Sequence, residues 1–149
     1  MILREATIGD IPQMHVVRTS VNENQLSNPT LISSNDYEEY LNHRGKGWVV
    51  EINDFIAGFA IVDLVDKNVW ALFVHPEYEG KGFGKMLHDE MITWYFDQTE
   101  KNIWLSTGPG TKAERFYKKA GWKETAVQVN GEIKFELTAK AWKEHKSEE

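Results

Sequence analysis

The feature that most constrains this chain is a strand that runs into a glycine-rich turn and then directly into a helix. It reads Leu72-Phe73-Val74-His75-Pro76-Glu77-Tyr78-Glu79-Gly80-Lys81-Gly82-Phe83-Gly84-Lys85. Glycine lets backbone amides approach a ligand closely, and amides at a helix N-terminus bind phosphate oxygens. The spacing fits neither a dinucleotide fingerprint nor a P-loop. Two interpretations therefore stay open at this point, another phosphate-bearing ligand or a plain turn.

Periodicity and turn residues around this segment predict a mixed α/β fold. Helices are expected from residue 10 to about 26, from 35 to 41 with Gly45 and Gly47 closing that segment, from 83 to 94, and from 111 to 120. The expected strands are 2–7, 48–52, 55–62, 69–74, 103–106, 124–129 and 132–137. Asn130-Gly131 between the last two strands is a strong hairpin signal. The charged tail from Ala139 is expected to fray.

Composition narrows the function classes. The 149 residues fit one domain, and the absence of cysteine excludes disulfides and thiolate chemistry. A net charge of −6 argues against a nucleic-acid partner, because phosphate binding needs a surplus of Lys and Arg. No apolar run approaches 18 residues, and charge begins at Arg4. We therefore expect a cytoplasmic protein with no membrane partner, and no residue spacing suggests a metal site.

A second motif identifies the family that the chain resembles. It reads Ala113-x-x-Phe116-Tyr117-x-x-x-Gly121-Trp122. Together with the element order, the strand Leu72–Val74 and the Gly80–Lys85 loop, it resembles the GNAT superfamily of acyl-CoA-dependent N-acetyltransferases, over nearly all of residues 1–149. The resemblance implies a central mixed, mostly antiparallel sheet flanked by about four helices. It also implies acetyl-CoA as cosubstrate, without a metal, and a primary amine of a small molecule or peptide as acceptor.

The resemblance also implies roles for particular residues. Backbone groups of Leu72, Phe73 and Val74 would pair with the pantetheine arm, and Tyr117 would stand near the thioester sulfur as a general acid. Thr111 would contact the coenzyme from its own turn. The pyrophosphate would be held by amides of the turn, namely those of Gly80, Lys81, Gly82, Phe83, Gly84 and Lys85.

Three positions depart from the family pattern. Glu79 stands where the motif usually has Gln or Arg, so it either points outward or is offset by Lys81 and Lys85. Gly110 replaces a frequent Asn three residues before Ala113. The strand around Trp104 offers no carboxylate to act as a general base. Four other residues remain candidates for the base, none favoured over the rest: Glu51, Asp63, Asp66 and His75.

Other residues have two interpretations each. Trp48 and Trp70 either line an acceptor pocket or, as the better interpretation, pack in the core. A basic cluster meets either a coenzyme 3′-phosphate or solvent: Lys112, Arg115, Lys118 and Lys119. His15, Glu23 and Asn24 fall between the first two helices, where relatives often build the acceptor site.

Three functions are compatible with the sequence. The leading one is an N-acetyltransferase in which the amine attacks the thioester directly. The alternative is a non-catalytic acyl-CoA-binding regulatory domain, and the third is an acidic interaction module whose glycine loop is only a turn. The exposed strands expected in the C-terminal hairpin make a homodimer a reasonable assembly.

Overall fold

The computed structural model describes residues 1–21 and 32–149. These residues form two compact units, Met1–Tyr95 and Phe96–Glu149, which we call unit 1 and unit 2. Unit 1 contains β1 (Ile2–Glu5), α1 (Ile11–Ser20), α2 (Ser34–Glu39), β2 (Gly45–Ile52), β3 (Phe55–Asp63), β4 (Asn68–Val74) and most of α3 (Phe83–Gln98). Short helical turns at Ile8–Asp10, Tyr40–Arg44 and Pro76–Tyr78 (η1, η2 and η3) connect them. Unit 2 contains β5 (Ile103–Thr107), α4 (Lys112–Lys119), β6 (Lys123–Val127), β7 (Ile133–Leu137) and α5 (Ala139–Ser147).

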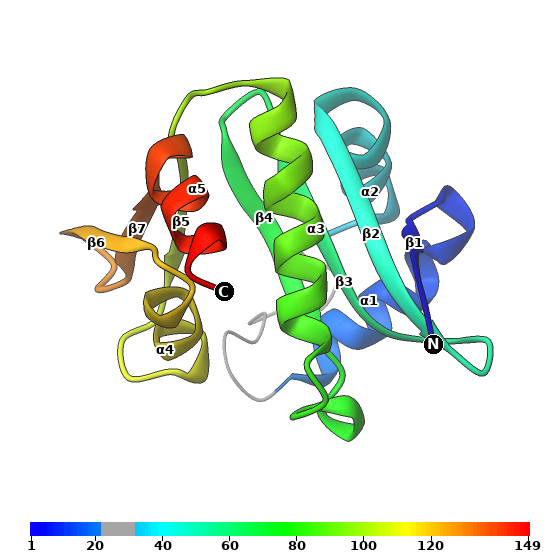
Figure 1. The fold of residues 1–149 in the computed structure, drawn as a ribbon. Coiled ribbons are helices and arrows are strands. Elements are labelled where there is room, and N and C mark those ends of the chain that lie inside the picture. Colours follow the sequence, from blue (N-terminus) through cyan, green and yellow to red (C-terminus); the bar gives the residue numbers. More distant parts are fainter. Residues whose placement is uncertain (22–31) are drawn as a thin grey trace. The chain divides into compact units, whose positions relative to one another are not determined.

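The sheet of unit 1 has the order β1-β2-β3-β4, and its neighbouring strands are all antiparallel. Helix α3 covers one face of this sheet, and α1 and α2 lie on the opposite face (Figure 1). Side chains from α1, α2 and the sheet form the core on that second face, with Met14, Tyr37, Phe59 and Ile61 almost fully buried. The expected mixed, mostly antiparallel α/β fold is confirmed.

Unit 2 has its own antiparallel pairings, in the order β5-β7-β6. The predicted hairpin is present: the Gly131 amide donates to the Gln128 carbonyl at 2.9 Å, and Gly131 has φ +87°. Alternate residues of β5 and β7 are buried, whereas every residue of β6 is exposed. Strand β6 is therefore the solvent-exposed edge of this unit's sheet.

One sequence-based expectation was half right and another was wrong. Gly45 ends the second helical segment as expected, because it is the C-cap of η2, but it is also the first residue of β2, and Gly47 lies inside that strand. A Cβ at Gly45 would lie 1.7 Å from the Val62 carbonyl oxygen, so glycine is required by the close approach of β3. That requirement comes from a strand distant in the sequence, and local patterns do not reveal it.

The second correction concerns the C-terminal tail, which was expected to fray. Residues Ala139–Ser147 form helix α5, with the Thr138 hydroxyl accepting a hydrogen bond from the Ala141 amide at 3.0 Å. Trp142 anchors the helix and is only 5% exposed. The described residues thus contain five α-helices rather than about four, because a cap and one buried aromatic stabilise a segment that is otherwise charged.

The first two helices begin close to their predicted starts. Pro12 stands at the first turn of α1. Ser33, which the sequence analysis did not single out, caps α2 by accepting from the Asp36 amide at 3.3 Å. The continuation of the first helix expected to about residue 26 lies partly outside the described residues.

Candidate functional site

Strand β4 supplies the backbone that was predicted to meet the pantetheine arm. Phe59 pairs with Phe73 and Ala60 with Leu72 across the β3–β4 ladder. Within unit 1, β3 pairs with one edge of β4. Backbone groups along a strand can bind an extended ligand as an added strand.

The glycine-rich turn joins the end of β4 to α3. Gly80 and Gly82 have φ of +77° and +84°, which is the left-handed region where side chains are rarely found. A Cβ at either position would meet nothing within 4 Å. Glycine is therefore required here by backbone conformation, and the space beside the turn is open.

Helix α3 begins immediately after this turn. The Gly82 carbonyl accepts the Met86 amide at 3.1 Å, which makes Gly82 the N-cap. Amides of a first helical turn have no partner within their helix and direct partial positive charge beyond its end. Strand, turn and helix thus give the geometry expected of a phosphate-binding helix N-terminus.

Of the two lysines expected to add positive charge at the turn, Lys85 is paired with a carboxylate. Lys81 is exposed, but Lys85 Nζ lies 2.7 Å from Asp89 Oδ2, and His88 Nδ1 lies 2.9 Å from Asp89 Oδ1. Burial raises the pKa of Asp89, but the hydrogen bonds and charges of His88 and Lys85 outweigh it and hold that pKa well below its ordinary value. An ionised Asp89 therefore offsets part of the positive charge of Lys85. Glu79 is exposed on the C-terminal side of η3.

His88 was not predicted from the sequence, yet it is fully buried on α3. In the expected helix 83–94 the apolar residues Phe83, Leu87, Met91 and Trp94 share one face, and His88 is not among them. The buried ring contacts Asp89, and the periodicity of the sequence does not predict this contact.

Tyr117, the predicted general acid, lies on α4 in unit 2 and is 6% exposed. Its ring makes edge contacts with Phe116 and Trp122, at centroid distances of 5.2 and 5.4 Å. Burial raises the pKa of its phenol, so the hydroxyl stays protonated at neutral pH. A buried phenol of this kind can donate a proton, and it cannot serve as a base.

The turn before α4 uses its polar groups locally. The Thr111 hydroxyl donates to the Gly108 carbonyl at 2.8 Å and accepts from the Glu114 amide at 3.1 Å. Gly110 has φ +73°, which explains why this position suits glycine or asparagine, the two residues that adopt left-handed backbone most readily. The predicted coenzyme contact of Thr111 would have to compete with its bond to Gly108.

The basic cluster on α4 is exposed, and its Lys118 forms an ion pair within the helix. Lys118 Nζ lies 2.8 Å from Glu114 Oε2. The hydrogen bond from Lys118 is the main reason why the pKa of Glu114 is lowered. Arg115 reaches back to the Gly110 carbonyl at 3.4 Å.

Three candidates for the general base belong to arginine networks in unit 1. Glu51 and Asp10 bind Arg4 at 2.8 and 2.9 Å. Asp63 and Asp66 each lie 2.8 Å from Arg44, at the end of the β3–β4 hairpin, where Asp63 pairs with Asn68. These contacts give the three carboxylates a structural role.

His75, the fourth base candidate, directly follows Val74 and accepts from the Glu77 amide through Nδ1 at 3.1 Å. It also lines a cavity of about 370 Å³ between α1, the start of β3 and η3. Val16, Phe55 and Tyr78 are among the other lining residues. Of the four candidates, His75 is the one adjacent to the predicted coenzyme strand.

The face of β4 opposite α3 carries an aromatic group that the sequence only partly indicated. The Trp70 ring stacks on Tyr40 at 4.1 Å and meets the edge of Tyr37 at 5.3 Å. Trp70 is the extra residue of a bulge, because Ile61 pairs with Ala71 while Val62 pairs with Val69. Trp48 instead meets Trp94 of α3 and is 4% exposed. Core packing therefore describes Trp48, whereas Trp70 is only half-buried.

Nearby on the same face, His15 Nδ1 lies 2.9 Å from the Tyr37 hydroxyl. The Arg18 guanidinium carbon lies 4.1 Å from the centre of the Phe73 ring. Glu23 and Asn24, which were grouped with His15 in the sequence analysis, lie outside the described residues.

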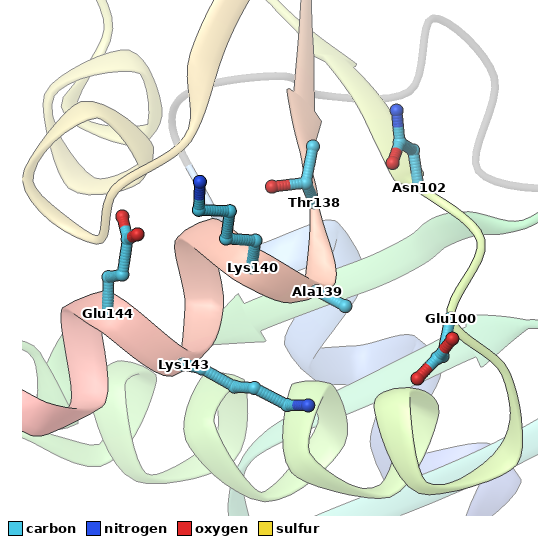
Figure 2. A pocket seen from close by; sticks show the side chains of 7 residues that line it. All are labelled: Glu100, Asn102, Thr138, Ala139, Lys140, Lys143 and Glu144. Carbon is cyan, nitrogen blue, oxygen red and sulfur yellow. The ribbon is translucent and has the colours of Figure 1, made fainter.

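Unit 2 contains a cavity of its own, of about 500 Å³, shown in Figure 2. Its lining comes from the start of α5 and the segment before β5, and includes Glu100, Lys140 and Lys143 (Figure 2). None of the predicted site residues lines it. In the described part of the chain, no helix is long and apolar enough to cross a membrane. Residues 1–21 and 32–149 also contain no group of three or more His, Cys, Asp or Glu side chains placed to hold a metal ion.

Comparisons with known proteins find similarity to acetyltransferases. The model of the acetyltransferase (GNAT) family matches residues 14–122. A [ribosomal protein bS18]-alanine N-acetyltransferase of Haemophilus influenzae is 30% identical over 101 residues, which are 66% of each chain and so a little under two thirds of the relative's length.

Solved structures share the fold at low identity. The ribosomal-protein-S18-alanine N-acetyltransferase of Escherichia coli has a TM-score of 0.74 at 17% identity, covering 92% of each chain. A GNAT-family acetyltransferase of Staphylococcus aureus Mu50 reaches 0.78 at 19% identity, over 92% of this chain and 98% of that one. The PaiA N-acetyltransferase of Thermoplasma acidophilum, solved in complex with coenzyme A, has a TM-score of 0.75 at 15% sequence identity, over 92% of this chain and 98% of that one.

Proposed function

The chain belongs to the acetyltransferase (GNAT) family, and on that basis we propose that it transfers the acetyl group of acetyl-CoA directly to a primary amine of a small molecule or peptide. The observation that carries the proposal is the glycine turn, with two left-handed glycines beside open space at the N-terminus of α3. The matched residues extend through both units, which supports treating residues 1–149 as one N-acetyltransferase domain.

In this proposal the coenzyme is bound mainly by backbone groups. Backbone groups of Leu72–Val74 in β4 would pair with the pantetheine arm, and the amides of residues 80–85 would hold the pyrophosphate. Backbone donors suit this task because they are fixed by the fold and lose little freedom on binding.

Tyr117 is the proposed general acid. The amine nitrogen forms a bond to the thioester carbon, the carbon–sulfur bond breaks, and the Tyr117 hydroxyl gives its proton to the departing thiolate. The ammonium formed on the acceptor loses its proton to water, and water restores the phenol. For unperturbed groups, a phenol of pKa about 10 and a thiol of pKa about 8.5 make this transfer uphill by about 2 kcal/mol. Burial of Tyr117 steepens that step while ensuring that the acid is protonated.

A thiol-release assay with a panel of amines tests the transfer directly. Tyr117→Phe should lower kcat by about 100-fold, within the range typical of general acids, and leave acetyl-CoA affinity within about twofold of wild type. Full activity in this variant would remove Tyr117 from the mechanism. If acetyl-CoA binds but no amine accelerates thiol release, the alternative of a non-catalytic acyl-CoA-binding domain replaces the enzyme.

The acceptor, the cellular location and the assembly also belong to the proposal. Because the Haemophilus relative acts on the alanine of a ribosomal protein, a peptide N-terminus is one candidate acceptor, and a cytoplasmic location follows from the same comparison. The exposed edge strand β6, where Val127 is 69% exposed, is the candidate surface for a homodimer.

A further inference from the structure

The cavity of about 370 Å³ beside His75 lies where three segments of unit 1 meet. Val16 lines it from α1, Phe55 from the start of β3, and Tyr78 from η3. All three side chains are apolar or aromatic, and the volume falls within the range of about 300–1,000 Å³ that is typical of ligand pockets. The cavity is therefore large enough for one large side chain or a small ligand.

Two of the apolar residues that line this cavity are open to solvent. Val16 is 59% exposed and Phe55 is 64% exposed, whereas their neighbours in the chain, Val17 and Ile56, are buried. All four line the same cavity, so exposed and buried apolar surface are continuous there. Exposed apolar surface that surrounds a cavity indicates a binding surface, in contrast to single apolar residues scattered over a protein.

The polar residues of the lining give the cavity a negative charge. Among the described residues that line it, Glu77 is the only acid, and none is a lysine or an arginine. Gln13 and His75 each use a side-chain acceptor to bind a backbone amide, at 2.9 and 3.1 Å. A further carboxylate, that of Asp54, is exposed directly before β3. Apolar lining beside two exposed carboxylates is complementary to an apolar group that lies next to a positive charge.

The charge of the whole chain argues against a second copy as the occupant. A copy with a net charge of −6 would bring like charge to a surface that is already acidic, and facing like charges disfavour association. A peptide with an apolar side chain beside a basic one matches both features of the cavity. His75, which lines the cavity, directly follows Val74, the last residue of the strand predicted to hold the pantetheine arm. The cavity is thus connected to the transfer site if the proposed function holds, and the inference rests on that function.

We propose that this cavity binds an apolar side chain of the acceptor peptide, and that Glu77 and Asp54 stabilise a lysine or arginine beside that side chain. The acceptor class is then a peptide amine, and part of its recognition takes place away from the reacting nitrogen. Contacts of this kind position a substrate and contribute to kcat/KM. Peptides with an aromatic or large aliphatic residue beside a basic one are therefore preferred over peptides that lack either.

Blocked dipeptides test the cavity without any transfer reaction. N-acetyl-Phe-Arg amide, N-acetyl-Phe-citrulline amide and N-acetyl-Ser-Arg amide are titrated into the protein at low salt, and their affinities are measured by NMR. The Phe-Arg peptide should bind at one site, about threefold more tightly than its neutral citrulline counterpart, as is typical of an exposed ion pair. The Ser-Arg peptide lacks the apolar side chain and should bind at least about tenfold more weakly.

Variants with matched controls locate this binding. Val16→Ser removes apolar lining and should weaken Phe-Arg binding by about fivefold. Val65→Ser removes a valine of similar exposure, 54%, that does not line the cavity, and should leave the binding unchanged. Glu77→Gln should reduce the preference for Arg over citrulline to below about twofold. Glu90→Gln removes an exposed carboxylate from α3, on the other face of the sheet (Figure 1), and should not change that preference.

Thermal denaturation of the four variants checks that the fold persists. Equal effects of Val16→Ser and Val65→Ser, or of Glu77→Gln and Glu90→Gln, would overturn the assignment of the binding to this cavity. Absence of saturable binding of the Phe-Arg peptide to the wild type would overturn it as well.

Peptides with a free N-terminus test whether the cavity serves the acceptor. We would measure kcat/KM by thiol release for peptides in which one to four alanines precede Phe-Arg amide or Ser-Arg amide. At one length or more, the Phe peptide should be favoured by about fivefold in the wild type and by less than about twofold in Val16→Ser.

The outcomes separate this inference from the activity on which it rests. Acetylation of small amines but of none of these peptides, a preference absent at every length, or one that survives Val16→Ser overturns the inference and leaves the acetyltransferase function intact. Failure of acetyl-CoA itself to bind would instead remove the proposed function.

Discussion

Two pairs of glycines with the same spacing serve opposite purposes in unit 1. Gly45 and Gly47 stand in β2, where an added Cβ would lie 1.7 Å from the Val62 carbonyl oxygen and 2.5 Å from a Leu41 methyl group, respectively. Gly80 and Gly82 stand in the turn before α3, where an added Cβ would meet nothing within 4 Å. The first pair is glycine because the protein fills the space, and the second because the backbone is left-handed. A Gly-x-Gly pattern thus becomes evidence for a ligand only once the surrounding space is known.

The largest effect on stability is expected at Gly45 and Gly47, where neighbouring atoms already fill the space that a side chain would need. Gly45→Ala forces β3 backbone to move, and overpacking of this kind should cost about 3 kcal/mol of unfolding free energy. For a chain of this size that corresponds to a fall in Tm of about 10 °C, measured by thermal denaturation. The control is Gly9→Ala, whose Cβ would have an ordinary contact of 3.7 Å with Thr7. Equal stability of these two variants would contradict the distinction drawn between the pairs.

Substitution at Gly80 or Gly82, beside open space, should lower the affinity for the ligand more specifically than it lowers the stability of the fold. Gly82→Ala places a methyl group beside the proposed pyrophosphate site, so acetyl-CoA affinity should fall about tenfold, which is about 1.4 kcal/mol. Left-handed strain should also lower stability by about 1–2 kcal/mol. Titration calorimetry measures the first effect and thermal denaturation the second.

Gly131→Ala is the matched control for that variant. Gly131 has φ +87° and also has nothing within 4 Å of its added Cβ, but it lies in the β6–β7 turn of unit 2. It should show a similar loss of stability and an unchanged acetyl-CoA affinity. If both alanine variants bind acetyl-CoA as the wild type does, the open space beside Gly82 is not a coenzyme site.

The smallest effect concerns the carboxylate that precedes the open pair. Glu79 is exposed, so its repulsion of a bound pyrophosphate is screened by water and should be worth only a few tenths of a kcal/mol. Glu79→Gln should therefore tighten acetyl-CoA binding by about twofold at low salt, as measured by calorimetry. Glu77→Gln removes another exposed charge two residues earlier. If it tightens binding as much as Glu79→Gln does, the effect is one of net charge and not of the position of Glu79.

Much of the fold could be predicted because local signals determine it. The start of α4 near residue 111 and the hairpin at Asn130-Gly131 were both predicted, since caps and turns act within a few residues. The role of Gly45 could not be predicted, because it depends on Val62 across the sheet. The burial of His88 on α3 and of Trp142 on α5 likewise arises from packing between elements, which local patterns do not show.

The candidate site divides in the same way. The backbone elements of the coenzyme region were predictable, because glycines and a following helix are visible in the sequence. The pairing of Lys85 with Asp89, the engagement of Asp63 by Arg44 and the place of Arg18 over Phe73 were not. Each of these contacts joins side chains that meet because of helix phase or tertiary packing. The composition of the sequence does not predict such contacts.

The most direct test of the account is calorimetric titration of acetyl-CoA into the wild-type protein beside Gly82→Ala and Gly131→Ala. The account predicts saturable binding at one site in the wild type and in Gly131→Ala, with affinity about tenfold lower in Gly82→Ala. Absence of binding to the wild type at millimolar acetyl-CoA would contradict it, and the turn before α3 would then be a connection between a strand and a helix with no coenzyme to hold.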